Sequence, residues 1–489
     1  MKRLSGRDSC ALTRRGFLAT SLAALGGKAF AIGSGGVPAL KFGVLSDVHV
    51  RNPETNDREV IARAFTYFRD RGADAVVIAG DLSDEGIMGQ VEIVSQAWYK
   101  VFPGDKAPDG RKVEKVFIIG NHEHDAAKMR LKRILQAQGK GNPFYERGEA
   151  MADDFAGNWD KLFHEPWAKQ YEKEVCGFKF FASHWVEKNE MEDVAAFIDP
   201  RLAGYGDGKP FFHVQHAHPY GTVRGSLIHG TWMGQNAFNA LSKHPNAISF
   251  SGHSHTSLTD ERTLWQGAFT AIGTSTLRRV SLGGTEENAA ARTDADGRMM
   301  PAMINNTMGR QGQFVEVYDD RVVVERREFV WGESLGPDRV IPWPPVRKPF
   351  EPETLEKATP APAFAAGAAL EVSAPFDGKT RGGAAMRQVT VSFPPARGGE
   401  GRVYAYDIEA SGADGETVTK TYLQERLFLT PKHWPKRNAF PFPADAAGMG
   451  RTLRVYPKNC FGLRGRPLSF TVSANTAKLA DWEKTQKKV

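Results

Sequence analysis

The order of apolar and polar positions between residues 37 and 125 predicts alternating strands and helices. Mostly apolar runs occupy 37–50, 73–81 and 113–125, and each has the length of a buried strand. Between them, apolar residues recur at helical spacing in 56–72 and 90–102. This β-α-β-α-β order predicts three parallel strands with right-handed crossovers, so the carboxyl ends of the strands should meet at one edge of a sheet.

The pattern becomes more varied after this unit. A polar stretch with helical character covers about 129–171, and short apolar segments between 262 and 330 are expected to complete a second sheet. Further elements are expected as strands at 176–186, 209–219 and 246–255 and as a helix at 237–245. The whole region therefore indicates a mixed α/β fold.

Composition changes near residue 336. The segment 336–368 is rich in Pro, Ala and Glu, which is typical of a semi-rigid linker. Beyond it, two-residue alternation predicts about seven strands and no helix, which indicates a small β-sandwich. The expected parts are a signal peptide at 1–31, an α/β domain at 38–335, the linker at 336–368, an all-β domain at 369–475 and a basic tail at 476–489.

Charge and cysteine content narrow the class of protein. The chain carries a net charge of +7, but its first 31 residues hold six Lys or Arg and one Asp, so the remainder carries +2. This near-neutral balance argues against a nucleic-acid-binding platform. Beyond the first 31 residues only Cys176 and Cys460 occur, and two alternatives stay open, one disulfide between domains or two free thiols.

The amino terminus has the form of an export signal. An arginine pair precedes a short, weakly apolar run that ends in Ala29-Phe30-Ala31, a small-x-small cleavage site. The run is too short to span a bilayer, and no other stretch predicts a transmembrane segment. Residues 13–18 resemble a twin-arginine signal, which implies export to the periplasm or beyond; a general secretory signal is the alternative.

Side chains that bind metals follow five of the expected strands, each next to a glycine or another small residue. A single acid or histidine at a strand end is usually a cap or a packed side chain, but five such ends are poorly explained in that way. Because the strand ends share an edge, we expect these groups to converge. They are Asp47 and His49; Asp81; Asn121, His122 and Glu123; His216 and His218; and His253 and His255.

This ligand set predicts a centre of two metal ions. Carboxylates and imidazoles without a thiolate suit Mn, Fe or Zn as divalent or trivalent ions. Two ions about 3.5–4 Å apart need a shared carboxylate. We expect Asp81 to be that bridge, because it ends the middle strand of the first three. A water shared by the ions would supply hydroxide to attack phosphorus.

The motifs Asp-x-His, Gly-Asp, Gly-Asn-His-Glu, His and Gly-His-x-His occur in an order that resembles the calcineurin-like metallophosphoesterase superfamily. The resemblance covers roughly 40–335 and implies a four-layer α/β/β/α sandwich. It also implies that His122 contacts the phosphoryl group or protonates the leaving oxygen. By the same resemblance, the first ion would be held by Asp47, His49, Asp81 and His255, and the second by Asp81, Asn121, His216 and His253.

Some assignments keep alternatives. His216 is preferred as a ligand because it is the first candidate past its strand, and His218 is the alternative. His218 and Glu123 are also candidates for groups that orient the ligands. In the all-β region, "VTVSFPPA", "YAYDIEA" and "NCFGLRG" resemble a fibronectin type III or related immunoglobulin-like module, which implies an architecture but no function.

These features together predict an exported hydrolase that uses two metal ions to cleave a small phosphate-ester substrate, with phosphodiesters favoured and monoesters possible. The alternative is a non-catalytic, metal-bearing protein of the cell surface that serves in binding or adhesion. The presence of a competent residue at every ligand position, together with His122, favours the enzyme.

Overall fold

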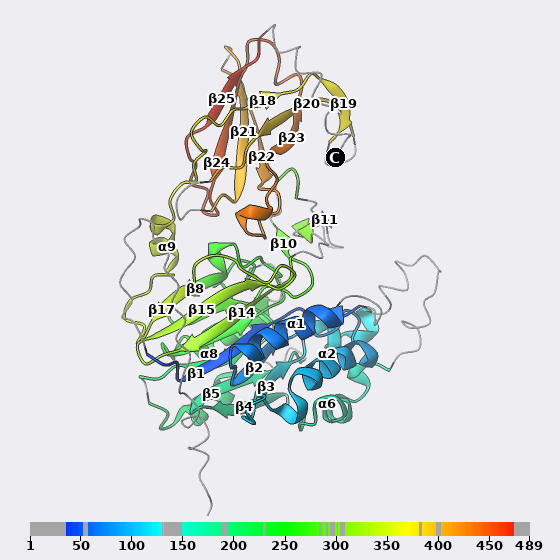
Figure 1. Ribbon diagram of the computed structural model, residues 1–489, viewed down its shortest axis with the longest axis vertical. Helices are drawn as coiled ribbons and strands as arrows, with labels where there is room; N and C mark the ends of the chain where they lie inside the picture. Colours follow the sequence, from blue (N-terminus) through cyan, green and yellow to red (C-terminus); the bar gives the residue numbers. More distant parts are fainter. Residues whose placement is uncertain are drawn as a thin grey trace, which may run out of the picture.

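The computed structural model describes residues 36–51, 57–129, 131, 149–186, 194–206, 208–227, 231–282, 286–289, 292–293, 299–300, 302–303, 309–380, 384–397, 402–413 and 415–473. An α/β part and a C-terminal all-β part lie one above the other (Figure 1). The expected signal peptide at 1–31 and the basic tail at 476–489 lie outside the described residues. No described helix has both the length and the apolar character needed to cross a membrane.

The first sheet contains the three parallel strands that the pattern predicts. They are β1 (Leu40–Leu45), β2 (Ala75–Ala79) and β3 (Glu114–Ile118), with β2 in the middle. On the other side of β1 the order continues with antiparallel β14 (Gln311–Val317) and β15 (Arg321–Glu328). The sequence analysis placed this region in the second sheet, and that expectation is wrong for β14 and β15, because β14 pairs along the edge of β1 that β2 leaves open.

The second sheet has the order β4-β5-β6-β7-β9-β8. Its central strands β5, β6, β7 and β9 run parallel to one another. The edge strand β4 begins at the end of the stretch 129–171 for which the pattern predicted helical character, and it pairs antiparallel with β5. The strands are β4 (Gln170–Val175), β5 (Phe178–Ser183), β6 (Phe211–Val214), β7 (Ala247–Ser251), β8 (Leu264–Gln266) and β9 (Thr270–Gly273).

The two sheets pack face to face between two layers of helices. In the middle, the ring of Phe42 on β1 meets Phe180, Phe212 and Phe250 of the second sheet edge-on, at 5.2, 4.9 and 5.6 Å between ring centres. Helices α1 (Asp57–Asp70), α2 (Met88–Val101) and α6 (Phe155–Phe163) cover the first sheet, and α7 (Val194–Ile198) and α8 (Thr231–Leu241) cover the second. The predicted α/β/β/α sandwich is therefore confirmed.

Helix α1 illustrates how the apolar pattern fixes a layer. The predicted stripe is buried, and it ends in Phe68, whose ring lies directly over Gly43 of β1. A Cβ at position 43 would collide with that ring, so the glycine lets the helix approach the sheet closely. The apolar spacing of the helix and the glycine in the strand thus specify the same contact.

The first part of the segment 336–368, which the composition assigned to a linker, belongs to the first sheet. β16 (Glu333–Ser334) and β17 (Arg339–Pro342) both pair with β15. Alternate residues of β17 are buried, so this segment, within the expected 336–368 linker, belongs to the core of the α/β part. The chain then forms α9 (Pro352–Ala358) before it enters the all-β part.

The C-terminal part consists of two four-stranded antiparallel sheets around a core that includes Phe393, Tyr406 and Phe440. It contains eight strands where the pattern predicted about seven. One sheet contains β18 (Glu371–Val372), β19 (Phe376–Lys379), β20 (Ala385–Phe393) and β23 (Asn438–Pro443), and the other contains β21 (Ala405–Ser411), β22 (Thr417–Leu423), β24 (Thr452–Lys458) and β25 (Leu468–Thr471). The all-β prediction is confirmed, and the fibronectin-like assignment stays a prediction.

An apolar contact joins the two parts. Val280 and Leu282 of the α/β part pack with Leu427, Phe428 and Leu429 of the C-terminal part. Two short antiparallel strand pairs lie in the same region, β10 (Ser281–Leu282) with β13 (Ala302–Met303) and β11 (Arg292–Thr293) with β12 (Met299–Met300). Cys460 is a free thiol, so the bridge to Cys176 that the sequence left open is not formed.

Candidate metal centre

Carboxylate and imidazole groups from the ends of β1, β2, β3, β6 and β7 converge at one edge of the paired sheets, as the strand order predicts. They form three groups in which every ligand atom lies within 4.8 Å of the others. Asp81 belongs to two of the groups, and so does His49. The groups are Asp47, His49 and His255; His49, Asp81 and His122; and Asp81, His216 and His253.

The first group is compact and buried. His255 Nε2 lies 2.9 Å from Asp47 Oδ1 and 3.0 Å from His49 Nε2. The same His49 atom lies 3.5 Å from Asp81 Oδ2. Two imidazole nitrogens and two carboxylate oxygens therefore face one small volume, which is the donor set that a borderline divalent or trivalent ion prefers.

The group of Asp81, His216 and His253, called the second group from here on, lies next to the first, because Asp81 is also close to His49. His216 Nε2 lies 3.0 Å from Asp81 Oδ2, and His253 Nδ1 lies 3.3 Å from His216 Nε2. One carboxylate oxygen of Asp81 is thus close to imidazoles of both groups. This agrees with the sequence argument that the residue after the middle strand is placed to serve both.

Asn121 begins the short helix α3 (Asn121–His124) directly after β3. Its Oδ1 atom is buried and has no hydrogen-bond partner among the described residues. A buried amide oxygen without a partner costs free energy unless a cation or another donor satisfies it. The residue types and this orphaned oxygen both fit a metal ion.

The histidines are held so that one nitrogen faces the centre. His216 Nδ1 lies 2.7 Å from the carbonyl oxygen of Ala79, and His255 Nδ1 lies 2.8 Å from that of Arg279. A carbonyl oxygen only accepts hydrogen bonds, so both Nδ1 atoms carry the proton and both Nε2 atoms are free to bind a metal.

The backbone at the centre adopts a conformation that is rare for residues with side chains. Asp47, His49, Asp81, His253 and His255 all have φ between 46° and 69°. Such left-handed residues carry strain and concentrate at functional sites. Their common conformation turns each strand end sharply, so that neighbouring side chains point at the same centre.

Glycines next to the ligands make room for this packing. A Cβ at position 80 would collide with the His216 ring, and one at position 120 would collide with Asp81. A Cβ at position 252 would collide with Ser46 and Asp47. The glycines in the Gly-Asp, Gly-Asn-His and Gly-His motifs therefore have a steric reason, because a predicted ligand from another strand occupies the space of their missing side chain.

The carboxylates and imidazoles of this buried site stabilise one another's charged forms. Burial raises the pKa of Asp47 and of Asp81, but the positive charges of neighbouring histidines outweigh it and hold both carboxyls well below their usual value. Burial lowers the pKa of His49 and His216, but their contacts with these carboxylates raise both to about 9. In the ion-free protein the acids are therefore charged and the two histidines hold protons that a metal must displace.

Asp84 is the main residue that the sequence analysis left out of the site. Its Oδ1 lies 3.1 Å from His49 Nδ1, and its Oδ2 accepts from Nε of Arg51 at 2.6 Å. It orients His49 as a carboxylate behind a ligand histidine does in metal sites. The signal was present in "GDLSD", where a second acid follows the predicted ligand Asp81 by three residues.

His122 lies beside the first group, with its ring 4.5 Å from that of His49. Its Nδ1 lies 2.6 Å from the carbonyl oxygen of Asp84, and its Nε2 lies 3.9 Å from Asp81 Oδ2. Burial lowers the pKa of His122 to about 4. The side chain is 17% exposed, whereas those of His49 and His216 are at most 1% exposed, so His122 faces the opening of the centre.

The two predicted supporting residues have different positions. Glu123 accepts from the amide and hydroxyl of Ser83, both at 2.7 Å, and from the amide of Gly120 at 2.9 Å, so it ties together the loops after β2 and β3. His218 lies 2.7 Å from the hydroxyls of both Ser251 and Ser254. Because both His218 nitrogens contact serines, His216 is the better ligand candidate of the two.

The family comparison agrees with this geometry. Residues 40–257 match the family model described as calcineurin-like phosphoesterase. They form a calcineurin-like phosphoesterase domain. The enzyme prediction is thereby confirmed: the chain is a metal-dependent hydrolase of phosphoric esters by class. The individual ligand roles stay predictions.

Comparison with solved structures finds matches at low identity. A dimetal phosphatase from Danio rerio is 14% identical, with a TM-score of 0.37, and the match covers 63% of this chain and 100% of that one. A purple acid phosphatase from yellow lupin (Lupinus luteus) seeds is 13% identical, with a TM-score of 0.36 and coverage of 62% and 54%. No curated protein matches the sequence.

Proposed function

We propose that the phosphoesterase domain hydrolyses phosphate esters at a centre of two metal ions and prefers phosphodiesters to monoesters. The single observation that carries this proposal is the position of Asp81, whose Oδ2 lies 3.5 Å from His49 Nε2 and 3.0 Å from His216 Nε2. One carboxylate therefore reaches both ligand groups. In this proposal the first ion is held by Asp47, His49, Asp81 and His255, and the second by Asp81, Asn121, His216 and His253.

The donor set suits Mn, Fe or Zn. When bound, such ions lower the pKa of water and polarise a phosphoryl group. The protein contributes to this chemistry by keeping Asp47 and Asp81 ionised and by holding the imidazoles in a fixed orientation. Preorganised ligands of this kind need no rearrangement when a substrate arrives.

His122 is positioned to assist the departure of the leaving group. Its Nδ1 proton is fixed on the carbonyl oxygen of Asp84, so Nε2 is the atom that faces the opening. There Nε2 can contact a phosphoryl oxygen or, when protonated, pass its proton to the leaving oxygen. An anionic substrate nearby favours the protonated imidazole, which counteracts the effect of burial.

Trp185 supports the preference for phosphodiesters. Its ring lies 5.5 Å from that of His253 and 5.8 Å from that of His216, centre to centre. An apolar, partly exposed wall beside the second ligand group favours an uncharged ester substituent over the additional anionic oxygen of a monoester.

The proposal includes export of the chain. The arginine pair, the weakly apolar run and the Ala29-Phe30-Ala31 cleavage site support a twin-arginine signal at 1–31. Replacing Arg14 and Arg15 with lysine should retain the precursor inside the cell. Unchanged export of that variant would contradict a twin-arginine route.

Hydrolysis of bis(4-nitrophenyl) phosphate compared with 4-nitrophenyl phosphate tests the proposed reaction, because both substrates release the same leaving group. The assay would use the chain loaded with Mn, Fe or Zn. We expect faster diester turnover and near-background rates in Asp81→Asn. Asp109→Asn is the matched control, since its carboxylate is an exposed partner of Arg111. Faster monoester turnover would contradict the diester preference, and full activity in Asp81→Asn would contradict the centre.

A further inference from the structure

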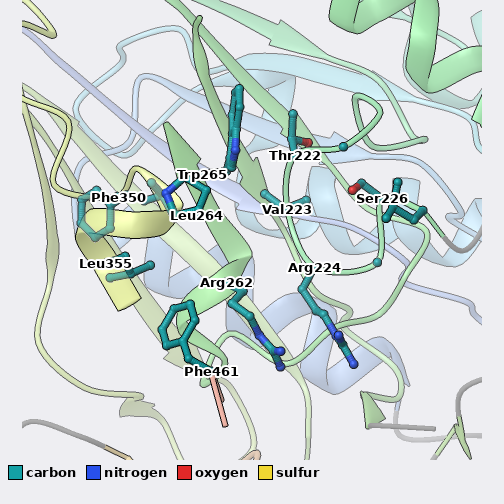
Figure 2. Close-up of a pocket in the computed structure, with 14 residues that line it drawn as sticks. Thr222, Val223, Arg224, Ser226, Arg262, Leu264, Trp265, Phe350, Leu355 and Phe461 are labelled. Atoms are coloured by element: carbon teal, nitrogen blue, oxygen red, sulfur yellow. The ribbon is translucent and has the colours of Figure 1, made fainter. Parts of the chain in front are cut away.

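A separate cavity of about 490 Å³ lies where the α/β part, helix α9 and the C-terminal part meet (Figure 2). Its walls come from the loop 221–227, the beginning of β8, the segment 350–355 and Phe461. None of the predicted metal ligands lines it. Small-molecule sites typically have volumes of about 300–1,000 Å³ and often lie at domain boundaries, so this cavity has the size and place of a ligand site.

The walls are largely apolar and are held in place before any ligand binds. Leu264, Trp265, Phe350, Leu355 and Phe461 supply aromatic and aliphatic surface to these walls (Figure 2). Phe350 is fixed to β8 by two hydrogen bonds with Gln266, at 3.0 and 3.1 Å. Because these contacts already fix the aromatic and aliphatic side chains, a ligand that binds against them would order few groups and lose little conformational entropy.

The turn that carries Phe461 is fixed as well. Asn459 Nδ2 donates to the carbonyl oxygen of Thr359, just after α9, at 3.1 Å, and the amide of Phe461 donates to Asn459 Oδ1 at 3.0 Å. The C-terminal part therefore contributes Phe461 to the cavity from a turn that is hydrogen-bonded to the residue after α9.

Two arginines give the cavity a positive end. Arg262 is held by Asp260 through Nε at 2.9 Å and a terminal nitrogen at 2.6 Å. The amide of Arg224 donates to the carbonyl oxygen of Arg262 at 2.9 Å, so the two residues are neighbours. The guanidinium of Arg224 has no hydrogen bond or ion pair with any described residue. Asp260 thus pairs with Arg262, and the positive charge of Arg224 has no ion-pair partner among the described residues beside the apolar walls.

We propose that this cavity binds a small organic anion with an apolar body and a carboxylate or phosphate-type head. The planar guanidinium of Arg224 can donate two parallel hydrogen bonds to such a head, while Arg262 stays paired with Asp260. The alkyl or aryl body packs against Trp265, Phe350 and Leu355, where its burial removes apolar surface from water. An apolar pocket with a single convergent charge selects for both halves of this ligand.

The cavity borders the metal centre without being part of it. The Thr256 hydroxyl donates to the carbonyl oxygen of Arg224 at 3.3 Å, and a Cβ at Gly225 would collide with the side chain of Ser254. Ser254 lies between the predicted ligands His253 and His255. A test must therefore separate binding in the cavity from binding of the same anion at the metal centre.

Calorimetric titration of the metal-loaded chain with octanoate, octylphosphonate and 1-octanol provides that test. The carbon–phosphorus bond of the phosphonate excludes turnover at the metal centre. We expect saturable binding of at least one anion, with binding of 1-octanol at least tenfold weaker. Arg224→Gln should weaken anion binding at least tenfold, and Leu355→Asn should weaken it too. Arg387→Gln, an exposed arginine outside the cavity, should leave it unchanged.

The two anions distinguish the chemistry of the head group, and binding of either supports the proposal. Asp81→Asn should bind the anion as the unmodified chain does. Loss of binding in Asp81→Asn would assign the anion to the metal centre and overturn the proposal. Equal binding of 1-octanol, or no saturable binding at millimolar concentration, would also overturn it. None of these readouts depends on hydrolysis, so they are independent of the proposed reaction.

Discussion

His255 Nδ1 lies 2.8 Å from the carbonyl oxygen of Arg279, and the amide of Ser281 donates back to the carbonyl oxygen of His255 at 2.7 Å. The segment between these two contacts includes Val280, which packs against Phe428 of the C-terminal part together with Leu282. The C-terminal part therefore supports the segment that orients a predicted ligand of the first ion. Its removal should affect metal binding even though none of the predicted ligands belongs to it.

Phe428→Ala tests this support. The loss of the buried ring should loosen the Arg279–Ser281 segment and weaken binding of the first ion by about 10- to 100-fold, as is typical for residues behind metal ligands. The second ion should be retained. Metal titration followed by native mass spectrometry would measure both. Met449→Ala, at a side chain that is 70% exposed, is the control. Two ions bound with unchanged affinity by a folded Phe428→Ala chain would show that the contact does not reach His255.

Asp84→Asn should weaken metal binding by about 10- to 100-fold, because the variant loses the charge that orients and polarises His49. Burial raises the pKa of Asp84, but the close contact with His49 and its charge outweigh it and hold the pKa well below its usual value, so the carboxylate is ionised at neutral pH. Calorimetric metal titration would measure the change. Wild-type affinity in Asp84→Asn would mean that the His49 contact needs no charge.

His122→Gln should lower turnover of alkyl phosphodiesters by about 10²- to 10⁴-fold, the usual contribution of a general acid. The number of bound metal ions should not change. With a 4-nitrophenolate leaving group, which needs little protonation, the loss should be smaller. An equal loss for both leaving groups would argue against proton donation, and a parallel loss of metal would make His122 a ligand.

Metal binding should release protons and become tighter as pH rises towards 9. In the ion-free protein the pKa values of His49 and His216 are raised to about 9, so both imidazoles are protonated at pH 7 and must lose a proton to bind a cation. Calorimetry in buffers with different ionisation enthalpies counts the released protons. Metal affinity that does not change between pH 7 and pH 9 would contradict this prediction.

The buried His213 on β6 should make the fold sensitive to acid. Burial lowers its pKa to about 3, whereas in the unfolded chain it titrates near its ordinary value of about 6.5. Between these values only the unfolded chain binds the proton, so the free energy of unfolding falls as pH decreases. Denaturation would measure the free energy of unfolding at pH 7 and at pH 4.5. The decrease between these pH values should be about 2–3 kcal/mol smaller in His213→Gln than in the unmodified chain. Equal losses would show that His213 does not couple folding to protons.

The sequence predicted those parts of the fold that repeat a simple local pattern. β1, β2 and β3 are short buried runs, and α1 has a complete apolar stripe, so spacing alone identified them. β23 was missed because "NAFPFP" contains two prolines, which interrupt a typical strand pattern. The strand pairs with β20 and has no other described neighbour, and such an edge tolerates residues that lack an amide donor.

The candidate metal centre could also be predicted only in part. The convergence of Asp47, Asp81 and His253 followed from strand ends that meet at one edge, so ligand candidates could be taken from the sequence. The orientation of those ligands depends on contacts across long sequence separations. His255 is oriented by a backbone oxygen of Arg279, and any residue type supplies such an atom. No motif could have predicted that contact.

Anomalous diffraction at the metal edges of the exported, active protein tests the central claim most directly. We predict two peaks per chain, about 3.5–4 Å apart, on either side of the Asp81 carboxylate, with the first beside His49 and His255 and the second beside Asn121 and His253. A single peak, or two peaks that do not share Asp81, would contradict the dinuclear centre on which the proposed hydrolysis depends.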